Sequence, residues 1–224
     1  MDPLVSLAAA SLAFVGTHFA LSHPLRAPLA GTLGEAGFSL VYSLVAAAAM
    51  VWMYLAFSAS PPADLGGSGD IGWVIATVLT LPALVLLLGS FRGNPALAAP
   101  GAAAAAQREP SGVFRVTRHP MMWGFALWAV SHLVLLWSWR TMVVALAILV
   151  LALVGARLQD RKKEVLMGEA WKGWEAKTSY WPRWSKLASA GPLLWIAAIA
   201  AWLGITWAHI CAGGIPAGIW RWIG

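Results

Sequence analysis

The sequence contains few charged residues. Asp, Glu, Lys and Arg make up 11% of its 224 residues, whereas 60% are hydrophobic. Soluble domains carry roughly 25% charged and about 45–50% apolar residues, so this chain has too little polar surface to cover a globule in water. A disordered chain is excluded as well, because disorder requires low hydrophobicity together with high net charge.

Cysteine is nearly absent, and short alternating apolar segments are not found. Cys211 is the single cysteine, which excludes a scaffold built on internal disulfides. The apolar stretches are long continuous runs, unlike the alternating strands of a transmembrane barrel. These absences leave an all-α protein, a polytopic membrane helical bundle that forms a single membrane domain.

Six stretches are apolar and long enough to cross a bilayer as helices, which takes ~20 residues each. The predicted spans lie near residues 4–21, 37–57, 71–91, 120–137, 141–156 and 192–211. Met1, Asp2 and Pro3 form no basic segment, so the first stretch is predicted to be a retained helix and not a cleaved signal peptide.

The basic residues divide sharply between the two ends of the predicted bundle. Thirteen of the fifteen Lys and Arg residues follow the first, third and fifth spans, and the other two are Arg140 and Arg221. The positive-inside rule then places both termini outside the cytoplasm of a bacterial-type inner (plasma) membrane. The net charge of +6 is explained by this topology and by attraction to anionic lipid, so the lipid bilayer is an expected partner and nucleic acid is not.

An amphipathic helix is predicted near residues 158–182, in the interface on the cytoplasmic side. Apolar residues and one threonine recur there at spacings of 4, 3, 4 and 3, with Lys and Arg between them: Met167, Trp171, Trp174, Thr178 and Trp181. Such a helix lies in the plane of the interface. It could serve as a lipid anchor or as a lid over a site at the cytoplasmic face.

Histidines inside predicted spans are the first candidates for function, because ionisable groups in a membrane are costly and usually functional. His18 lies in the first span and His132 in the fourth, and none of the spans contains Asp or Glu. A neutral imidazole with one hydrogen bond would be a purely structural role. A proton relay or an ordinary metal site would lack carboxylate and thiolate partners, whereas haem takes only axial ligands from the protein.

A basic run precedes the fourth span. Pro120 suits the first helical turn, so His119 is predicted to cap the helix, with Arg115 and Arg118 beside it. Arginines at a helix N-terminus favour an anion. That anion could belong to a lipid headgroup or to the carboxylates or phosphates of a cofactor.

The run Arg118-His119-Pro120, followed by Trp128 and His132, resembles the NnrU family and its relative, 15-cis-ζ-carotene isomerase. The similarity extends along most of the chain, through Thr17-His18, Leu25-Arg26, Leu33-Gly34-Glu35, Asp160-Arg161, Gly168-Glu169-Ala170-Trp171, Lys177-Thr178-Ser179, Pro182 and Ala208-His209. The isoprenylcysteine methyltransferases share the His-Pro element and the Gly-Glu-aromatic segment. The histidines at positions 18 and 132 favour the first two groups over the methyltransferases.

The resemblance implies a membrane protein that binds haem b through His18 and His132 and acts as a cis–trans isomerase of a carotenoid. The substrate would be an apolar polyene, or another lipid-soluble small molecule, entering from the bilayer. His18 would be the fixed ligand and His132 the labile one. The isomerase has a cysteine three residues before its second histidine, and Ala129 occupies that position here.

Two other functions stay open. One is an NnrU-type haem protein without isomerase activity, linked to denitrification or nitric oxide handling. The other is an S-adenosylmethionine-dependent membrane methyltransferase, which leaves His18 and His132 without a role. Its cofactor pocket would lie under the interfacial helix and use Arg118, His119, Glu169 and Arg183. Finally, His23, His119 and His209 are further candidates for the second haem ligand.

Overall fold

The computed structural model describes residues 1–97 and 101–223, and within these it contains helices and turns but no strand. The α-helices are α1 (Pro3–Ser22), α2 (Arg26–Ala59), α3 (Gly69–Gly89), α4 (Ala102–Ala106), α5 (Pro120–Leu133), α6 (Trp139–Met167), α7 (Glu169–Lys177), α8 (Pro192–Gly213) and α9 (Trp220–Ile223). Two 3-10 turns, η1 (Gly112–Arg115) and η2 (Trp184–Ala190), complete the set. The predicted all-α class is confirmed.

Five of these helices, namely α1, α2, α3, α6 and α8, are long and apolar enough to cross a membrane. They correspond to five of the six predicted spans, and a helical membrane bundle is confirmed. The sixth, α5, has 14 residues, about 21 Å at 1.5 Å per residue, which is shorter than a hydrocarbon core of ~30 Å.

The predicted fourth span, residues 120–137, is therefore corrected at its end. The helix stops at Leu133, and Leu136 adopts a positive φ of 47°. The carbonyl oxygens of residues 135–137 accept hydrogen bonds from the backbone N–H groups of Ser68, Gly67 and Leu65 in the loop before α3. Pairing with a distant loop thus replaces the last helical turn.

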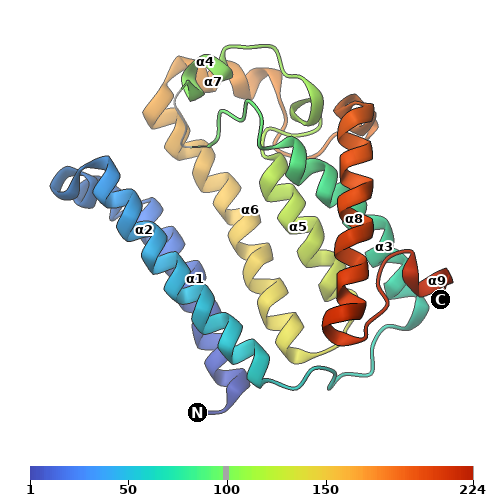
Figure 1. Cartoon of the computed structure of the whole chain (residues 1–224). Helices are drawn as coiled ribbons and strands as arrows, with labels where there is room; N and C mark the ends of the chain where they lie inside the picture. Colours follow the sequence, from blue (N-terminus) through green and yellow to red (C-terminus); the bar gives the residue numbers. More distant parts are fainter. Residues whose placement is uncertain (98–100, 224) are drawn as a thin grey trace.

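The long helices form a row in the order α2, α1, α6, α5, α3 and α8, each packed on the next. Figure 1 shows neighbouring helices of this row running in opposite directions, except α1 and α6, which run the same way; the N-terminus and the end of α8 lie at the lower end, and α4 and α7 at the upper end. Residues 7, 10 and 14 of α1 make a helical stripe that packs on Ala49, Met53 and Ala56 of α2. Small residues at such contacts let the helices approach closely.

The predicted interfacial helix near residues 158–182 is also corrected. Its first part continues the fifth span, so α6 runs to Met167, and Gly168 with φ 54° separates α6 from α7. Glycine adopts this conformation without a steric cost. Trp171 and Trp174 of α7 are buried in a core cluster with Phe114, so these two tryptophans pack against protein and not lipid.

Candidate functional site

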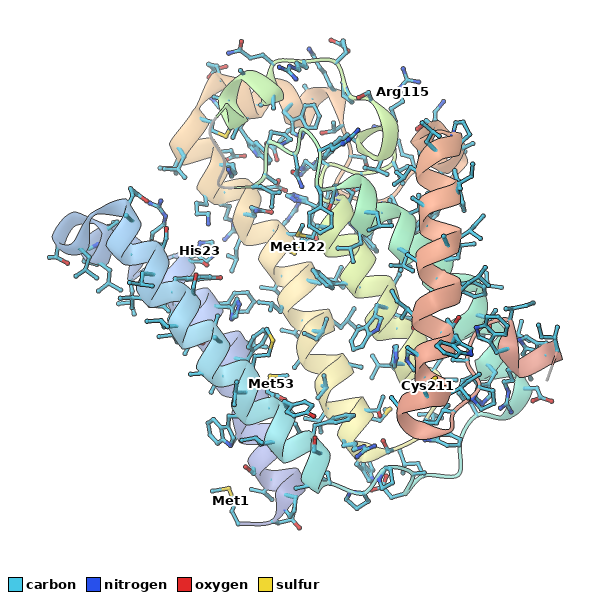
Figure 2. The ribbon with its side chains drawn as sticks, in the orientation of Figure 1. Met1, His23, Met53, Arg115, Met122 and Cys211 are labelled. Atoms are coloured by element: carbon cyan, nitrogen blue, oxygen red, sulfur yellow. The ribbon has the colours of Figure 1, made fainter. Side chains whose placement is uncertain are left out.

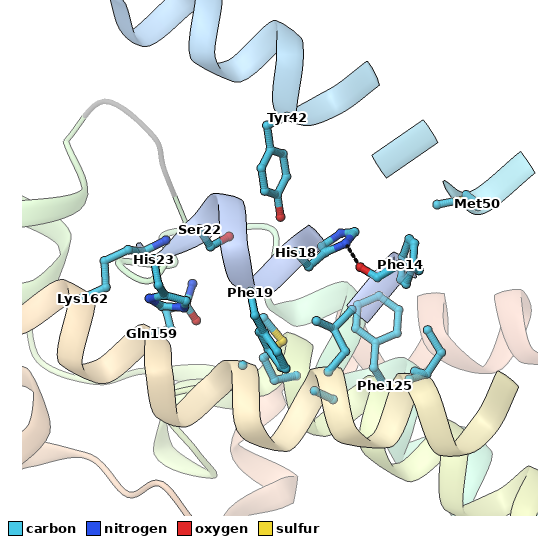
Figure 3. A pocket seen from close by; sticks show the side chains of 15 residues that line it. Phe14, His18, Phe19, Ser22, His23, Tyr42, Met50, Phe125, Gln159 and Lys162 are labelled. Carbon is cyan, nitrogen blue, oxygen red and sulfur yellow. Dashed lines mark hydrogen bonds between the residues drawn. The ribbon is translucent and has the colours of Figure 1, made fainter. Parts of the chain in front are cut away.

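A cavity of about 420 Å³ lies between α1, α2, α5 and α6. Figure 3 shows it from close by. Its walls are mainly apolar, and they include Phe14, Phe19, Met50, Met122, Phe125 and Leu151. Pockets for small molecules and cofactors typically measure about 300–1,000 Å³ and are lined mostly by such side chains. The cavity is therefore large enough for a ligand of that class.

One face of α6 forms a wall of the cavity. Apart from the adjacent pair Leu151 and Ala152, its lining residues recur at spacings of 3 and 4, from Ile148 through Gly155 and Gln159 to Lys162. This spacing keeps them on one side of the helix. The wall is apolar as far as Gly155, where a Cβ would lie 3.8 Å from the ring of Phe19, and polar beyond it.

His18 enters this cavity from α1 (Figure 3). Its Nδ1 lies 2.7 Å from the carbonyl oxygen of Phe14. A carbonyl oxygen only accepts, so Nδ1 donates this hydrogen bond, and in the neutral imidazole Nε2 then keeps its lone pair. Histidines that bind metals usually have the other ring nitrogen fixed in this way. The Phe14 and Tyr42 rings flank the imidazole, with centroids 4.2 and 5.5 Å from its own.

His132 is placed elsewhere. It has the same local geometry, with Nδ1 2.8 Å from the carbonyl oxygen of Trp128 and its ring beside the Trp128 indole, but it does not line the cavity. His132 follows the cavity residue Phe125 by seven positions. It therefore lies on the same face of α5, roughly 10 Å further along the helix. The structure does not bring His18 and His132 to one cavity wall, and the role of His132 as a ligand stays a prediction.

The other histidines considered as the second haem ligand also lie at different places in the fold. His23 lines the cavity at the end of α1, and His209 lies on α8, where its Nδ1 is 2.8 Å from the carbonyl oxygen of Ile205. Within residues 1–97 and 101–223, no three His, Cys, Asp or Glu side chains gather as ligands for a bare metal ion. A cofactor that brings most of its own ligands would need only a single side chain such as His18.

A buried ionic cluster, formed by Arg118, His119, Asp160 and Glu175, joins the start of α5 to α6 and α7. Arg118 donates two hydrogen bonds to Asp160, at 2.9 and 2.6 Å, and lies 3.1 Å from Glu175. His119 Nε2 is 2.7 Å from Asp160. Arg118 and His119 are 8% and 2% exposed. Burial raises the pKa of Glu175 above its ordinary value, and Asp160 adds to this, while Arg118 acts in the opposite direction.

The buried ionic cluster affects the predicted anion site, which was expected to use Arg115 and Arg118. Arg118 already has two protein carboxylates as partners. Arg115 is exposed and donates to the Pro110 carbonyl oxygen at 3.2 Å. Figure 2 shows it at the upper end of the molecule, away from His23 and Met122. A joint role of Arg115 and Arg118 in holding an anion of a cofactor stays a prediction.

Asp160 is a residue of this cluster to which sequence reasoning assigned no role. The sequence does contain a signal, because Asp160 follows a charge-free span and stands within a run of Arg and Lys. It does not show which basic side chain the Asp160 carboxylate contacts. Backbone pairing completes the arrangement: Arg118 N–H donates to Ser179 O and Arg183 N–H donates to Val116 O, both at 2.8 Å.

The residues expected for a methyltransferase pocket are distributed differently. Arg118 and His119 are buried on Asp160, whereas Glu169 is exposed and pairs with Lys172 at 2.7 Å. Arg183 is exposed in the loop after α7. The structure does not gather these four side chains around one cavity.

The protein-family model described as NnrU protein matches residues 6–217, almost the whole chain. No curated protein and no solved structure matches the chain.

Proposed function

The chain belongs to the NnrU protein family, and on this basis we propose that it is an inner-membrane haem b protein with His18 as an axial ligand. The observation that carries the proposal is the free Nε2 of His18 in a mainly apolar cavity of about 420 Å³. The hydrogen bond from Nδ1 to Phe14 holds the ring in one tautomer and one orientation.

The cavity residues fit a haem group. Aromatic side chains on two sides, Phe14 and Phe19 from α1 and Phe125 from α5, provide apolar walls for a flat macrocycle. When bound, haem supplies an iron centre whose properties depend on its axial ligands and on the polarity of its surroundings. The chain's part is to present the imidazole of His18 and to exclude water from most of the cavity.

The second ligand can be sought among four side chains. His132 is implied by the resemblance, while His23, Met50 and Met122 line the cavity itself. Imidazole and thioether are both established axial ligands of haem. We propose His132 as the second ligand, because the resemblance implies it. Met122, which lines the cavity, is the alternative that the experiment compares with it.

An absorption spectrum tests the proposal. The purified protein, expressed with sufficient haem, is expected to show a Soret band that is lost in His18→Ala. Thr17→Ala is the matched control, because Thr17 precedes His18 on α1 and donates to its own helix at the Ala13 carbonyl oxygen, but does not line the cavity. A colourless wild-type protein, or a Soret band that persists in His18→Ala, would overturn the proposal.

The same spectra identify the second ligand. If His132 is that ligand, His132→Ala changes the oxidised and reduced spectra while Met122→Leu leaves them unaltered. The reverse result assigns the position to Met122 and removes His132 from the site.

Isomerisation of an apolar polyene is the second candidate, and the mainly apolar cavity favours it because such a substrate could enter from the bilayer. Ala129 is completely buried and offers no thiol for ligand exchange. We therefore propose the NnrU-type haem protein first, with a role in denitrification or nitric oxide handling. If the haem-loaded protein converts a 15-cis polyene, isomerisation becomes the first candidate. If it does not, the NnrU-type haem protein stays first.

A further inference from the structure

One end of the cavity is polar and basic. Lys162 and Gln159 of α6 and Ser22 and His23 at the end of α1 line this end. Figure 3 shows Lys162 and His23 on one side of the cavity, with Met50 and Phe125 on the other. The cavity thus has an apolar part around His18 and a cationic end.

Among the residues that the structure describes, Lys162 has no anionic partner. It is half-buried, and no hydrogen bond or salt bridge joins it to another described residue. The ammonium group of the neighbouring Lys163 donates a hydrogen bond to the carbonyl oxygen of Leu97 at 3.0 Å. Arg26 forms an ion pair with Glu35 at 2.8 Å. Withdrawing an ammonium group from water is costly unless an anion compensates it. A ligand with an acidic end would supply that anion.

The spacing along α6 places this charge at a defined distance from His18. The ring of Phe19 lies 3.8 Å from the position of a Cβ on Gly155, so His18 is near the level of Gly155. Lys162 follows Gly155 by seven residues, which is two turns and roughly 10 Å on the same face of the helix. A ligand held at His18 and extending along α6 therefore presents its far end to Lys162.

We propose that Lys162, assisted by His23, binds the carboxylate edge of the haem and determines which way round the macrocycle lies in the cavity. This inference rests on the proposed function. Haem b has an apolar ring with two carboxylates on one edge, and this polarity matches a cavity that is apolar around His18 and cationic at Lys162. A lysine ammonium donates charge-assisted hydrogen bonds to carboxylates, which are stronger than neutral ones.

Comparison of haem with its dimethyl ester, in which both carboxylates are neutralised, tests the inference. Binding to the full-length apoprotein in detergent is measured by titration of the Soret band. The wild type is expected to bind haem about tenfold more tightly than the ester, the size of effect that one moderate interaction produces. Lys162→Met removes this preference but keeps the position of the band, because His18 is unchanged.

Two further variants serve as controls. Lys172→Met removes an exposed lysine of α7 and keeps the tenfold preference, and Lys162→Arg keeps the charge and most of the preference. If Lys162→Met folds poorly, Lys162→Gln, which removes the charge but keeps a polar side chain, takes its place and is expected to lose the preference in the same way. Equal binding of haem and ester by the wild type, or a preference that persists in Lys162→Met, overturns the role of Lys162. Failure of the wild type to bind either compound overturns the proposed function itself.

Discussion

Asp160 compensates two buried basic side chains at once. Its carboxylate receives both hydrogen bonds of Arg118 and also contacts His119. Breaking a buried ion pair by removing one partner is far more costly than replacing the whole pair with apolar residues, because a charge is left without compensation in a medium of low polarity. The carboxylate therefore matters for the fold at the point where α5, α6 and α7 meet.

Substitution of Asp160 by alanine is expected to destabilise the protein by about 3 kcal/mol, the lower end of the usual cost of breaking such a pair, because Glu175 stays 3.1 Å from Arg118. The measurement is unfolding in detergent, followed by the loss of helical circular dichroism. Glu109→Ala is the matched control, since it removes an exposed partner of Lys177 at a similar distance of 2.7 Å and is expected to cost less than about 1 kcal/mol. Equal effects of the two substitutions would contradict this account of the cluster.

Helices α3 and α5 approach so closely that one contact requires a glycine. A Cβ on Gly124 of α5 would lie 2.8 Å from the carbonyl oxygen of Ala83 and 3.2 Å from the amide nitrogen of Leu87, both in α3. Backbone atoms cannot move aside as a flexible side chain can, so the two helices would have to separate. This pair also positions Met122 and Phe125 at the cavity, two residues before and one residue after Gly124.

Gly124→Ala is accordingly expected to destabilise the protein by about 1–3 kcal/mol, the typical cost of overpacking. Thermal unfolding of the purified protein measures this change. Gly204→Ala on α8 is the control, because its Cβ would meet no atom within 4 Å and alanine is the better helix former. A destabilised Gly204→Ala together with an unaffected Gly124→Ala would refute the role of the close contact.

At the scale of the whole molecule, the helices place both termini at one end (Figure 1), and most basic residues lie in the loops at the other end. The end with α4 and α7 carries the loops after the first, third and fifth spans. The positive-inside rule predicts that this end faces the cytoplasm. The sidedness can be tested directly because the chain has a single cysteine to remove.

In a Cys211→Ser background, we expect Ala63→Cys, in the loop between α2 and α3, to react with a membrane-impermeant maleimide in intact cells. Lys172→Cys, on α7, is expected to react only after the membrane is permeabilised. Both positions are exposed, so accessibility of the side chain is matched. Labelling of Lys172→Cys alone in intact cells would show that the orientation is the opposite one.

The sequence by itself predicted the class of the protein, the places of the long helices and the resemblance to one family. These follow from local rules, since a segment in lipid must satisfy its own backbone hydrogen bonds and be apolar over its whole length. His18 was also found in this way, because a histidine within an apolar span stands out without knowledge of its neighbours. The end of α5 was missed, since it depends on hydrogen bonds from a loop some seventy residues earlier.

Only the tertiary structure decided which side chains meet. It placed His18 in a cavity that His132 does not line, joined Arg118 to Asp160 across 42 positions, and left Lys162 facing that cavity. It also turned Trp171 inward, where the sequence pattern left open whether this helix face anchors in lipid or covers a site. The physical reason is that apolar periodicity marks a helix face without identifying what covers it, and in this chain the partner comes from another helix far away in sequence.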